Sequence, residues 1–184
     1  MRKLSIGEVL VLLIVLLPFV ILAVVFSAGF VRTYRNSTSG MEPTLPMGSR
    51  IAAIPTKSIR RGDLVTFVYP LDPRVTFAKR IVALGGDVVE IKGKRLFVNG
   101  KEIDEPYAVH ADSVTYPRDA RLPEPYRSRD WFGPYSVPAG MLFVLGDNRD
   151  RSADSRYWGT VPQENVRGRV VVAFSWSRGF WKPR

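Results

Sequence analysis

The residues best suited to chemistry in this 184-residue chain are a lysine in an apolar stretch and two polar segments on either side of it. Lys79 lies between Phe77 and Ile81 in a run that alternates like a β-strand, which places these three side chains on one face. Burial there would lower the lysine pKa from about 10.4 toward the 7–8 of a useful general base. Taken alone, the segment also fits a lysine that extends from an edge strand into solvent.

The polar segments are 36–45, which supplies hydroxyl groups, and 146–159, which follows the apolar run 141–145. The later segment holds three Asp, three Arg and two Ser residues in one short loop. Polar loops that are carried by a rigid strand are common functional sites. This density of alternating charge favours a site over a solvated turn.

The chain has no cysteine, which excludes a thiol nucleophile, a disulfide framework and a cysteine zinc site. Its one histidine, His110, lies in a stretch rich in proline and charge, and we interpret it as a surface residue. We therefore expect no metal, no other cofactor and no histidine-based triad.

The N-terminal stretch from Val9 to Phe26 has no charged residue, and its apolar character continues to Val31. About 20 such residues suffice to cross a hydrocarbon core of about 30 Å. A cleavable secretory signal is the alternative, but its apolar region is only about 7–15 residues long. The sequence therefore predicts an uncleaved transmembrane anchor over residues 1–31. Basic residues precede and follow it in equal number, so charge leaves the topology open.

The net charge of +10 indicates an anionic partner. Because an apolar stretch is present, a membrane surface is a simpler partner than nucleic acid, and we expect no nucleic-acid binding. The tail 176–184 mixes aromatic and basic residues, which suits the lipid headgroup region. A frayed basic terminus is the alternative.

The remaining sequence, residues 32–184, predicts a mostly β domain of antiparallel sheets with tight turns. Asn99 and Gly100 form a favoured two-residue hairpin turn, which predicts a return strand over 101–103. Six prolines between about 104 and 138 break the strand pattern and predict a peripheral insertion. The other expected strands are 51–54, 64–69, 76–83, 88–91, 96–98, 142–145 and 170–176.

Three segments, 39–45, 77–87 and 146–159, resemble in the same order the signatures of type I signal peptidases, which are membrane-bound Ser/Lys endopeptidases. The resemblance implies a domain of coiled antiparallel sheets behind an N-terminal transmembrane helix. It also implies that Lys79 is the general base and that Ser152 orients its amine.

The resemblance further implies two ion pairs, one between Asp147 and Arg80 and one between Asp154 and Arg156. Such pairs would neutralise charge that is costly to hold near a buried amine. Gly85 stands where the family has a proline, a mild departure that concerns a turn.

The nucleophile position does not match. The family has a serine immediately before Met-x-Pro-Thr-Leu, and here Gly40 precedes Met41. Thr38 falls where the family has a hydroxyl that helps to form the oxyanion hole. Ser39 is a candidate replacement. In an extended segment, however, neighbouring side chains point to opposite sides and are about 3.8 Å apart along the chain. Ser39 would therefore point away from Lys79. The flexibility of glycine leaves a local change of backbone open.

The implied function is removal of signal peptides from exported preproteins after small residues at positions −1 and −3, with Met41 and Ala78 as pocket walls. The peptide would bind as an added strand along a sheet edge. The implied location is the bacterial cytoplasmic membrane, with a single pass and the catalytic domain on the non-cytoplasmic side. The alternative is an inactive protein that binds signal peptides without cutting them. A self-cleaving Ser/Lys repressor is discarded, because the apolar stretch stands where a DNA-binding motif would be.

Overall fold

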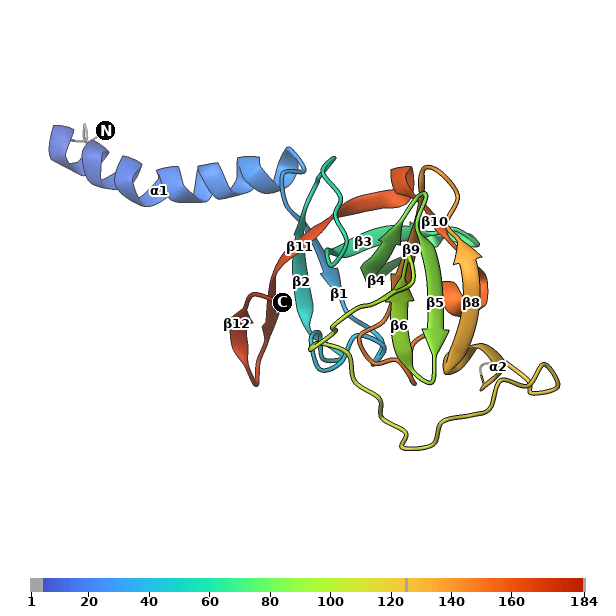
Figure 1. Cartoon of the computed structure of the whole chain (residues 1–184). Coiled ribbons are helices and arrows are strands. Elements are labelled where there is room, and N and C mark those ends of the chain that lie inside the picture. Colours follow the sequence, from blue (N-terminus) through green and yellow to red (C-terminus); the bar gives the residue numbers. More distant parts are fainter. Residues whose placement is uncertain (1–4, 125, 184) are drawn as a thin grey trace.

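The structure is a computed structural model that describes residues 5–124 and 126–183 (Figure 1). It is a mostly β domain with a long N-terminal helix, α1 (Ile6–Ser27), and very short helical segments elsewhere. The strands are β1 (Arg32–Arg35), β2 (Arg50–Ile54), β3 (Leu64–Tyr69), β4 (Asp72–Leu84), β5 (Val88–Lys92), β6 (Arg95–Val98), β7 (Lys101–Glu102), β8 (Trp131–Ser136), β9 (Met141–Leu145), β10 (Val161–Pro162), β11 (Val166–Ser175) and β12 (Gly179–Trp181).

The strands form two antiparallel sheets. One has the order β1-β2-β11-β3-β4-β9-β10, with β12 paired to β11, and the other has the order β7-β6-β5-β8. Register shifts occur in several pairs, among them β4 with β9 and β11 with both β2 and β3. Irregularities of this kind bend a strand and increase its twist. The predicted antiparallel β fold is confirmed.

Every strand predicted from the sequence is present, with bounds that differ by a few residues. Asn99 and Gly100 both have positive φ, 52° and 76°, as a type I′ turn requires. Four strands were missed, β1, β8, β10 and β12. β1 is a polar, mostly exposed edge strand, and β8 contains a glycine and a proline, so neither has the apolar alternation that would have revealed it.

The core joins the two sheets at β4 and β9. Val82 and Phe143, from these strands, pack with Val89 and Leu96 of the smaller sheet in one buried cluster. A second cluster lies under the segment 41–45, and a third contains Ile81 with Phe77 packed against it. Residues on both sides of Lys79 are therefore held by buried apolar contacts.

The segment expected as an insertion, 104–138, makes a long excursion between β7 and β8 (Figure 1). Its described part before residue 131 holds one helical turn, α2 (Tyr126–Arg129), and a single bridge from Val109 to Asn148. β8 lies inside the predicted limits but pairs with β5, so it is part of the second sheet.

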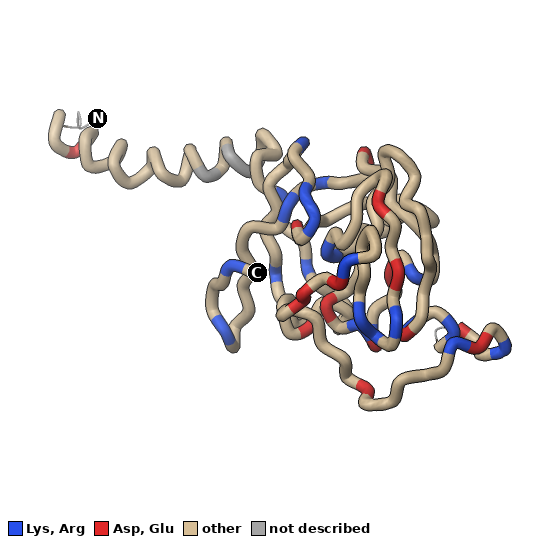
Figure 2. Tube along the Cα trace, viewed as in Figure 1, with Lys and Arg blue, Asp and Glu red and all other residues tan. Residues whose placement is uncertain are grey.

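Helix α1 stands away from the β domain (Figure 1), and those of its large apolar side chains that the structure describes are exposed. Its sequence has one acidic residue, Glu8, and no basic one, and Figure 2 draws a red segment near its N-terminal end. We expected a membrane-spanning anchor here. Among the residues that the structure describes, however, none of the helices has the length and apolar character needed to cross a membrane. The spanning anchor predicted over residues 1–31 is thus not found.

Candidate active site

Lys79 lies in the middle of the domain, on the long strand β4, with only 3% of its surface exposed. β4 is paired to β3 along this stretch, with Lys79 opposite Val65. The Nζ atom of Lys79 donates a hydrogen bond of 2.7 Å to Oγ of Ser152. The lysine is therefore buried rather than extended into solvent.

Burial lowers the pKa of Lys79 to about 8. Loss of hydration is the largest cause, because it disfavours the charged amine. The negative charges of Asp154 and Asp147 act in the opposite direction, and the positive charge of Arg156 adds to the lowering. With a pKa of about 8, about a tenth of Lys79 is the free amine at pH 7, and this form can accept a proton.

Gly40 lies against this amine. An ideal Cβ built on Gly40 would be 2.9 Å from Nζ of Lys79 and 3.3 Å from both Cα and Oγ of Ser152. The backbone of Gly40 is outside the left-handed region, so an L residue fits its conformation. A side chain at position 40 would therefore point at the Lys79 amine, whose flexible end would have to move by a few tenths of an ångström.

The two hydroxyl residues before Gly40 lie differently. Thr38 is exposed and Ser39 is partly exposed. In the described part of the chain, the Ser39 hydroxyl makes no hydrogen bond with Lys79 or Ser152, and Lys79 bonds to Ser152 instead. The roles predicted for Thr38 and Ser39 remain predictions.

Ser152 is held by close packing between the loop after β9 and the segment around Gly40. The amide of Asn148 donates to the carbonyl of Gly40 at 3.1 Å. Any Cβ at Gly146 would collide with Ser152 and with the Gly40 carbonyl. Glycine at position 146 therefore permits the close approach that brings Ser152 and Gly40 to the same amine.

A buried ion pair lies next to Lys79 in the sequence. Arg80 donates from Nε and Nη2 to the two oxygens of Asp147, at 2.8 and 2.7 Å, and both side chains are at most 4% exposed. Thr44 donates from its hydroxyl to the same carboxylate at 2.6 Å. The ring of Tyr107 covers the Arg80 guanidinium at 3.8 Å. These contacts link the segment 41–45, β4 and the loop after β9.

A second buried pair joins Asp154 and Arg156. Arg156 donates from Nε and Nη2 to the two carboxylate oxygens, both at 2.8 Å. Its Nη1 donates to the carbonyl of Arg129, and Nη2 also donates to the carbonyl of Arg149. Asp154 also accepts the amide of Gly146 at 3.1 Å. Burial by itself would raise the pKa of the Asp154 carboxyl, but the charge and hydrogen bonds of Arg156 bring it below its usual value. The Asp154 carboxyl is thus held in its charged form beside Arg156.

Sequence reasoning missed one contact that supports the loop. Glu105 binds Arg149 through two hydrogen bonds of 2.6 and 2.7 Å, and Arg149 donates from Nε to the carbonyl of Gly146. Val109 then exchanges backbone hydrogen bonds with Asp147 and Arg149. Because Glu105 and Arg149 are 44 residues apart and Glu105 lies in a segment without strand periodicity, no sequence pattern indicated the pair.

His110, interpreted from the sequence as a surface residue, is exposed, and its Nδ1 lies 3.7 Å from Asp150. Burial is the largest reason why its pKa lies below the usual value, against the attraction of Asp150. Throughout the described residues, no group of three or more His, Cys, Asp or Glu side chains is arranged to hold a metal.

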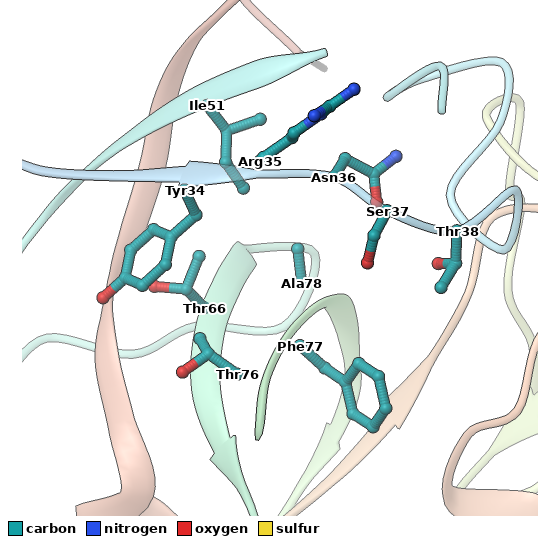
Figure 3. Close-up of a pocket in the computed structure, with 10 residues that line it drawn as sticks. All are labelled: Tyr34, Arg35, Asn36, Ser37, Thr38, Ile51, Thr66, Thr76, Phe77 and Ala78. Carbon is teal, nitrogen blue, oxygen red and sulfur yellow. The ribbon is translucent and has the colours of Figure 1, made fainter. Parts of the chain in front are cut away.

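A small cavity of about 20 Å³ opens beside the site (Figure 3). Residues Tyr34–Thr38 run along one side of it, and Thr76, Phe77 and Ala78 of β4 face them. Ala78 lines it, and its role as a wall of the substrate pocket remains a prediction. Met41 does not, because its side chain is fully buried in the second core cluster. A cavity of this volume has room for little more than a water molecule or a methyl group.

The chain is similar in sequence to known proteins. A family model described as signal peptidase, peptidase S26, matches residues 8–176. The signal peptidase I of Pseudomonas fluorescens is 33% identical over 201 residues, which cover 86% of this chain and 70% of that protein. The signal peptidase I of Aquifex aeolicus is 32% identical over 212 residues, which cover 88% of this chain and 82% of that protein.

A crystal structure of a signal peptidase I from Enterococcus faecalis V583 is similar to this chain, at 32% identity and a TM-score of 0.48. The match covers 62% of this chain and 98% of that one.

The Asp154–Arg156 pair provides a test of how the loop is held. Asp154→Ala should lower the free energy of unfolding by about 3–5 kcal/mol, because it leaves a buried guanidinium without its counter-charge. Asp119 and Arg121 make a pair of the same spacing on the surface, where the arginine side chain is 90% exposed. Asp119→Ala should change stability by less than about 1 kcal/mol. Urea unfolding measures both, and equal losses would contradict the structural role of the buried pair.

Proposed function

Because the chain belongs to the signal peptidase family (peptidase S26), whose members are serine peptidases, we propose that its site is built to remove signal peptides from exported preproteins with a Ser/Lys dyad. The observation that carries the proposal is the buried Lys79 amine, which has a pKa of about 8 and lies beside position 40. An unprotonated lysine next to a serine hydroxyl can act as the general base of acyl transfer.

The proposed reaction has two steps. Lys79 takes the proton of a hydroxyl at position 40, whose oxygen bonds to the scissile carbonyl carbon. The C–N bond then breaks, and the lysine returns the proton to the leaving amine. In the second step Lys79 takes a proton from water, whose oxygen bonds to the ester carbonyl carbon. The acyl C–O bond then breaks, and the lysine returns the proton to the serine oxygen as the acid product leaves. Ser152 orients the amine, and the Thr38 hydroxyl with the amide of residue 40 stabilises the oxyanion.

The substrate would bind as an extra strand between β4 and the segment 34–38. β4 pairs with β9 only from Arg80 onward, so the backbone of 76–79 has no described strand on that side. A peptide there would gain main-chain hydrogen bonds, and side-chain pockets would select its residues. The small cavity lined by Ala78 supports a preference for small residues at −1 and −3.

A second candidate function is favoured by Gly40 itself. The groups proposed to bind substrate are present, but Gly40, which lies beside the Lys79 amine, supplies no hydroxyl to attack the substrate. Such a protein would bind signal peptides and leave them uncut. Cutting by this sequence would then require Ser39 to replace the missing group through a change of backbone.

Gly40→Ser should restore the dyad. The unmodified protein should process a preprotein little or not at all, and the variant should cut it faster by on the order of 10³-fold or more, because the nucleophile is part of a cooperative unit. Appearance of the mature protein on gels measures the rate, and unfolding of each variant controls for stability. A clearly active parent that Ser39→Ala inactivates would instead identify Ser39 as the nucleophile.

The pH dependence of the restored enzyme tests the role of Lys79. Because the working form of the base is the free amine, the rate of Gly40→Ser should rise as the pH passes through about 8 and then level off. Adding Lys79→Met should abolish cutting without unfolding the protein, since methionine keeps the stem volume. Cleavage by the double variant at near the rate of Gly40→Ser would remove Lys79 from the mechanism.

We also propose that the protein works at a bacterial cytoplasmic membrane, with its β domain on the non-cytoplasmic side. Two apolar surfaces support contact with lipid. The large apolar side chains described in α1 are exposed, for example Phe19 at 67%. The terminal hairpin of β11 and β12 exposes Trp176 at 96% and Phe180 at 77%. Exposed aromatic residues beside basic ones suit the interface between headgroups and hydrocarbon.

Membranes washed at high salt or high pH should retain the full-length chain, because its apolar contact with lipid does not depend on charge. A chain that starts at Arg32 should still bind anionic vesicles through the terminal hairpin, but more weakly. Sedimentation with vesicles measures both. Recovery of a soluble form that begins near Ala28 would show that the first residues are a cleaved signal.

A further inference from the structure

A second, open groove of about 550 Å³ has a set of lining residues separate from that of the small cavity. Pro43 and Thr44 form one wall of it, and Tyr107 and Trp181 are among its other residues. The small cavity is lined by residues 34–38 and the groove by residues 43 and 44. Position 40 therefore lies between the two along one continuous stretch of chain.

The groove is connected to the site by hydrogen bonds. The hydroxyl of Thr44 donates to Asp147, which is paired with Arg80, the neighbour of Lys79. A substrate whose scissile bond lies at position 40 and whose small residues occupy the cavity would enter this groove with the residues after the bond. This step rests on the proposed function.

The walls of the groove are held in place without a ligand. The indole of Trp181 donates from Nε1 to the carbonyl of Thr44 at 3.1 Å. Tyr107 stacks on Arg80 and donates its hydroxyl to Glu105 at 2.9 Å. A preformed groove costs little ordering when a ligand binds.

The groove is positively charged. Arg178 and Lys182 line it, and none of its lining residues is acidic. Arg178 stacks over the ring of Trp181 at 4.7 Å. No ion pair engages either cation within the described chain, and the terminal hairpin in Figure 2 carries blue segments and no red ones. The alternation along β12 gives the two faces of the hairpin different surroundings, since Trp181 is bonded to Thr44 while Phe180 is exposed.

We propose that this groove binds the residues that follow the scissile bond, the beginning of the mature protein, and that it prefers acidic side chains among them. Arg178 and Lys182 supply charge complementary to acidic side chains of the peptide. Tyr107 and Trp181 supply apolar surface against which the bound peptide can pack. The terminal hairpin would thus be a determinant of which preproteins the site accepts.

The test uses the full-length protein in detergent micelles and fluorescent peptides with a ketomethylene group in place of the scissile amide, which prevents cutting. Two peptides share the same residues before the bond and differ after it, one with two Asp and the other with two Asn. The Asp peptide should bind about 3- to 10-fold more tightly, as expected for two partly exposed ion pairs. The preference should shrink at high salt.

The variant Arg178→Gln/Lys182→Gln should lose this preference. The control Lys57→Gln/Lys101→Gln removes the same charge from exposed positions outside the groove and should keep it. Equal affinities for the two peptides in the parent, or a preference that survives in the groove variant, would overturn the proposal. So would a groove variant that only loses binding to anionic vesicles, because the cations would then serve lipid.

A third peptide that ends at the scissile bond separates this proposal from the proposed function. It should bind both the parent and the groove variant, with an affinity that falls when bulky residues replace the small ones at −1 and −3. Failure of this peptide to bind would contradict the proposed function, whereas its binding together with insensitivity to acidic residues would contradict the groove alone.

Discussion

The site depends on keeping an amine out of water. An isolated buried ammonium is costly, and the neutral amine that replaces it still needs a hydrogen-bond partner, which Ser152 supplies. The charges around Lys79 come in two closed pairs, Arg80 with Asp147 and Arg156 with Asp154. Dehydration is the largest influence on the pKa of Lys79, and the charge of Arg156 opposes that of Asp154. A carboxylate without its arginine would favour the protonated lysine and leave less free amine at neutral pH.

Pairing of β4 with β9 brings these groups together. With Arg80 opposite Leu145, the loop that begins at Gly146 starts beside Lys79, although almost 70 residues separate them. The start of the segment between β7 and β8 then holds the loop through Glu105 and Val109. The loop that carries the site is therefore supported by both sheets and by the clamp that Glu105 forms with Arg149. Catalytic groups need rigid support of this kind if they are to be positioned within a fraction of an ångström.

The sequence predicted those parts that depend on local pattern. Alternating apolar runs revealed the strands of the core, and Asn99-Gly100 revealed its hairpin, because burial and turn geometry act on neighbouring residues. Polar edge strands such as β1 carry little of that pattern. The contacts of Lys79, Ser152 and Arg80 were expected from a resemblance, whereas the clamp between Glu105 and Arg149 was not, since a pair so distant in the chain has no local signal. Met41 was expected at the surface of a pocket and lies in the core, because its alternation within 36–45 is set by a turn rather than by an extended strand.

Binding and cutting rest on different groups in this molecule. Asn36 holds the segment 36–46. Its side-chain Nδ2 donates to the carbonyls of Leu45 and Pro46, and its backbone N–H donates to the carbonyl of Ser49. Trp181 fixes the same segment from the other end through Thr44. None of these contacts involves a side chain at position 40, so the small cavity, the free edge of β4 and the basic groove form whether or not a hydroxyl is there. Under the proposed function, Gly40 lacks the group that would attack the substrate, while the surfaces proposed to recognise it keep these contacts. A site of this kind can retain its choice of partners after losing its chemistry, and one side chain separates the two states.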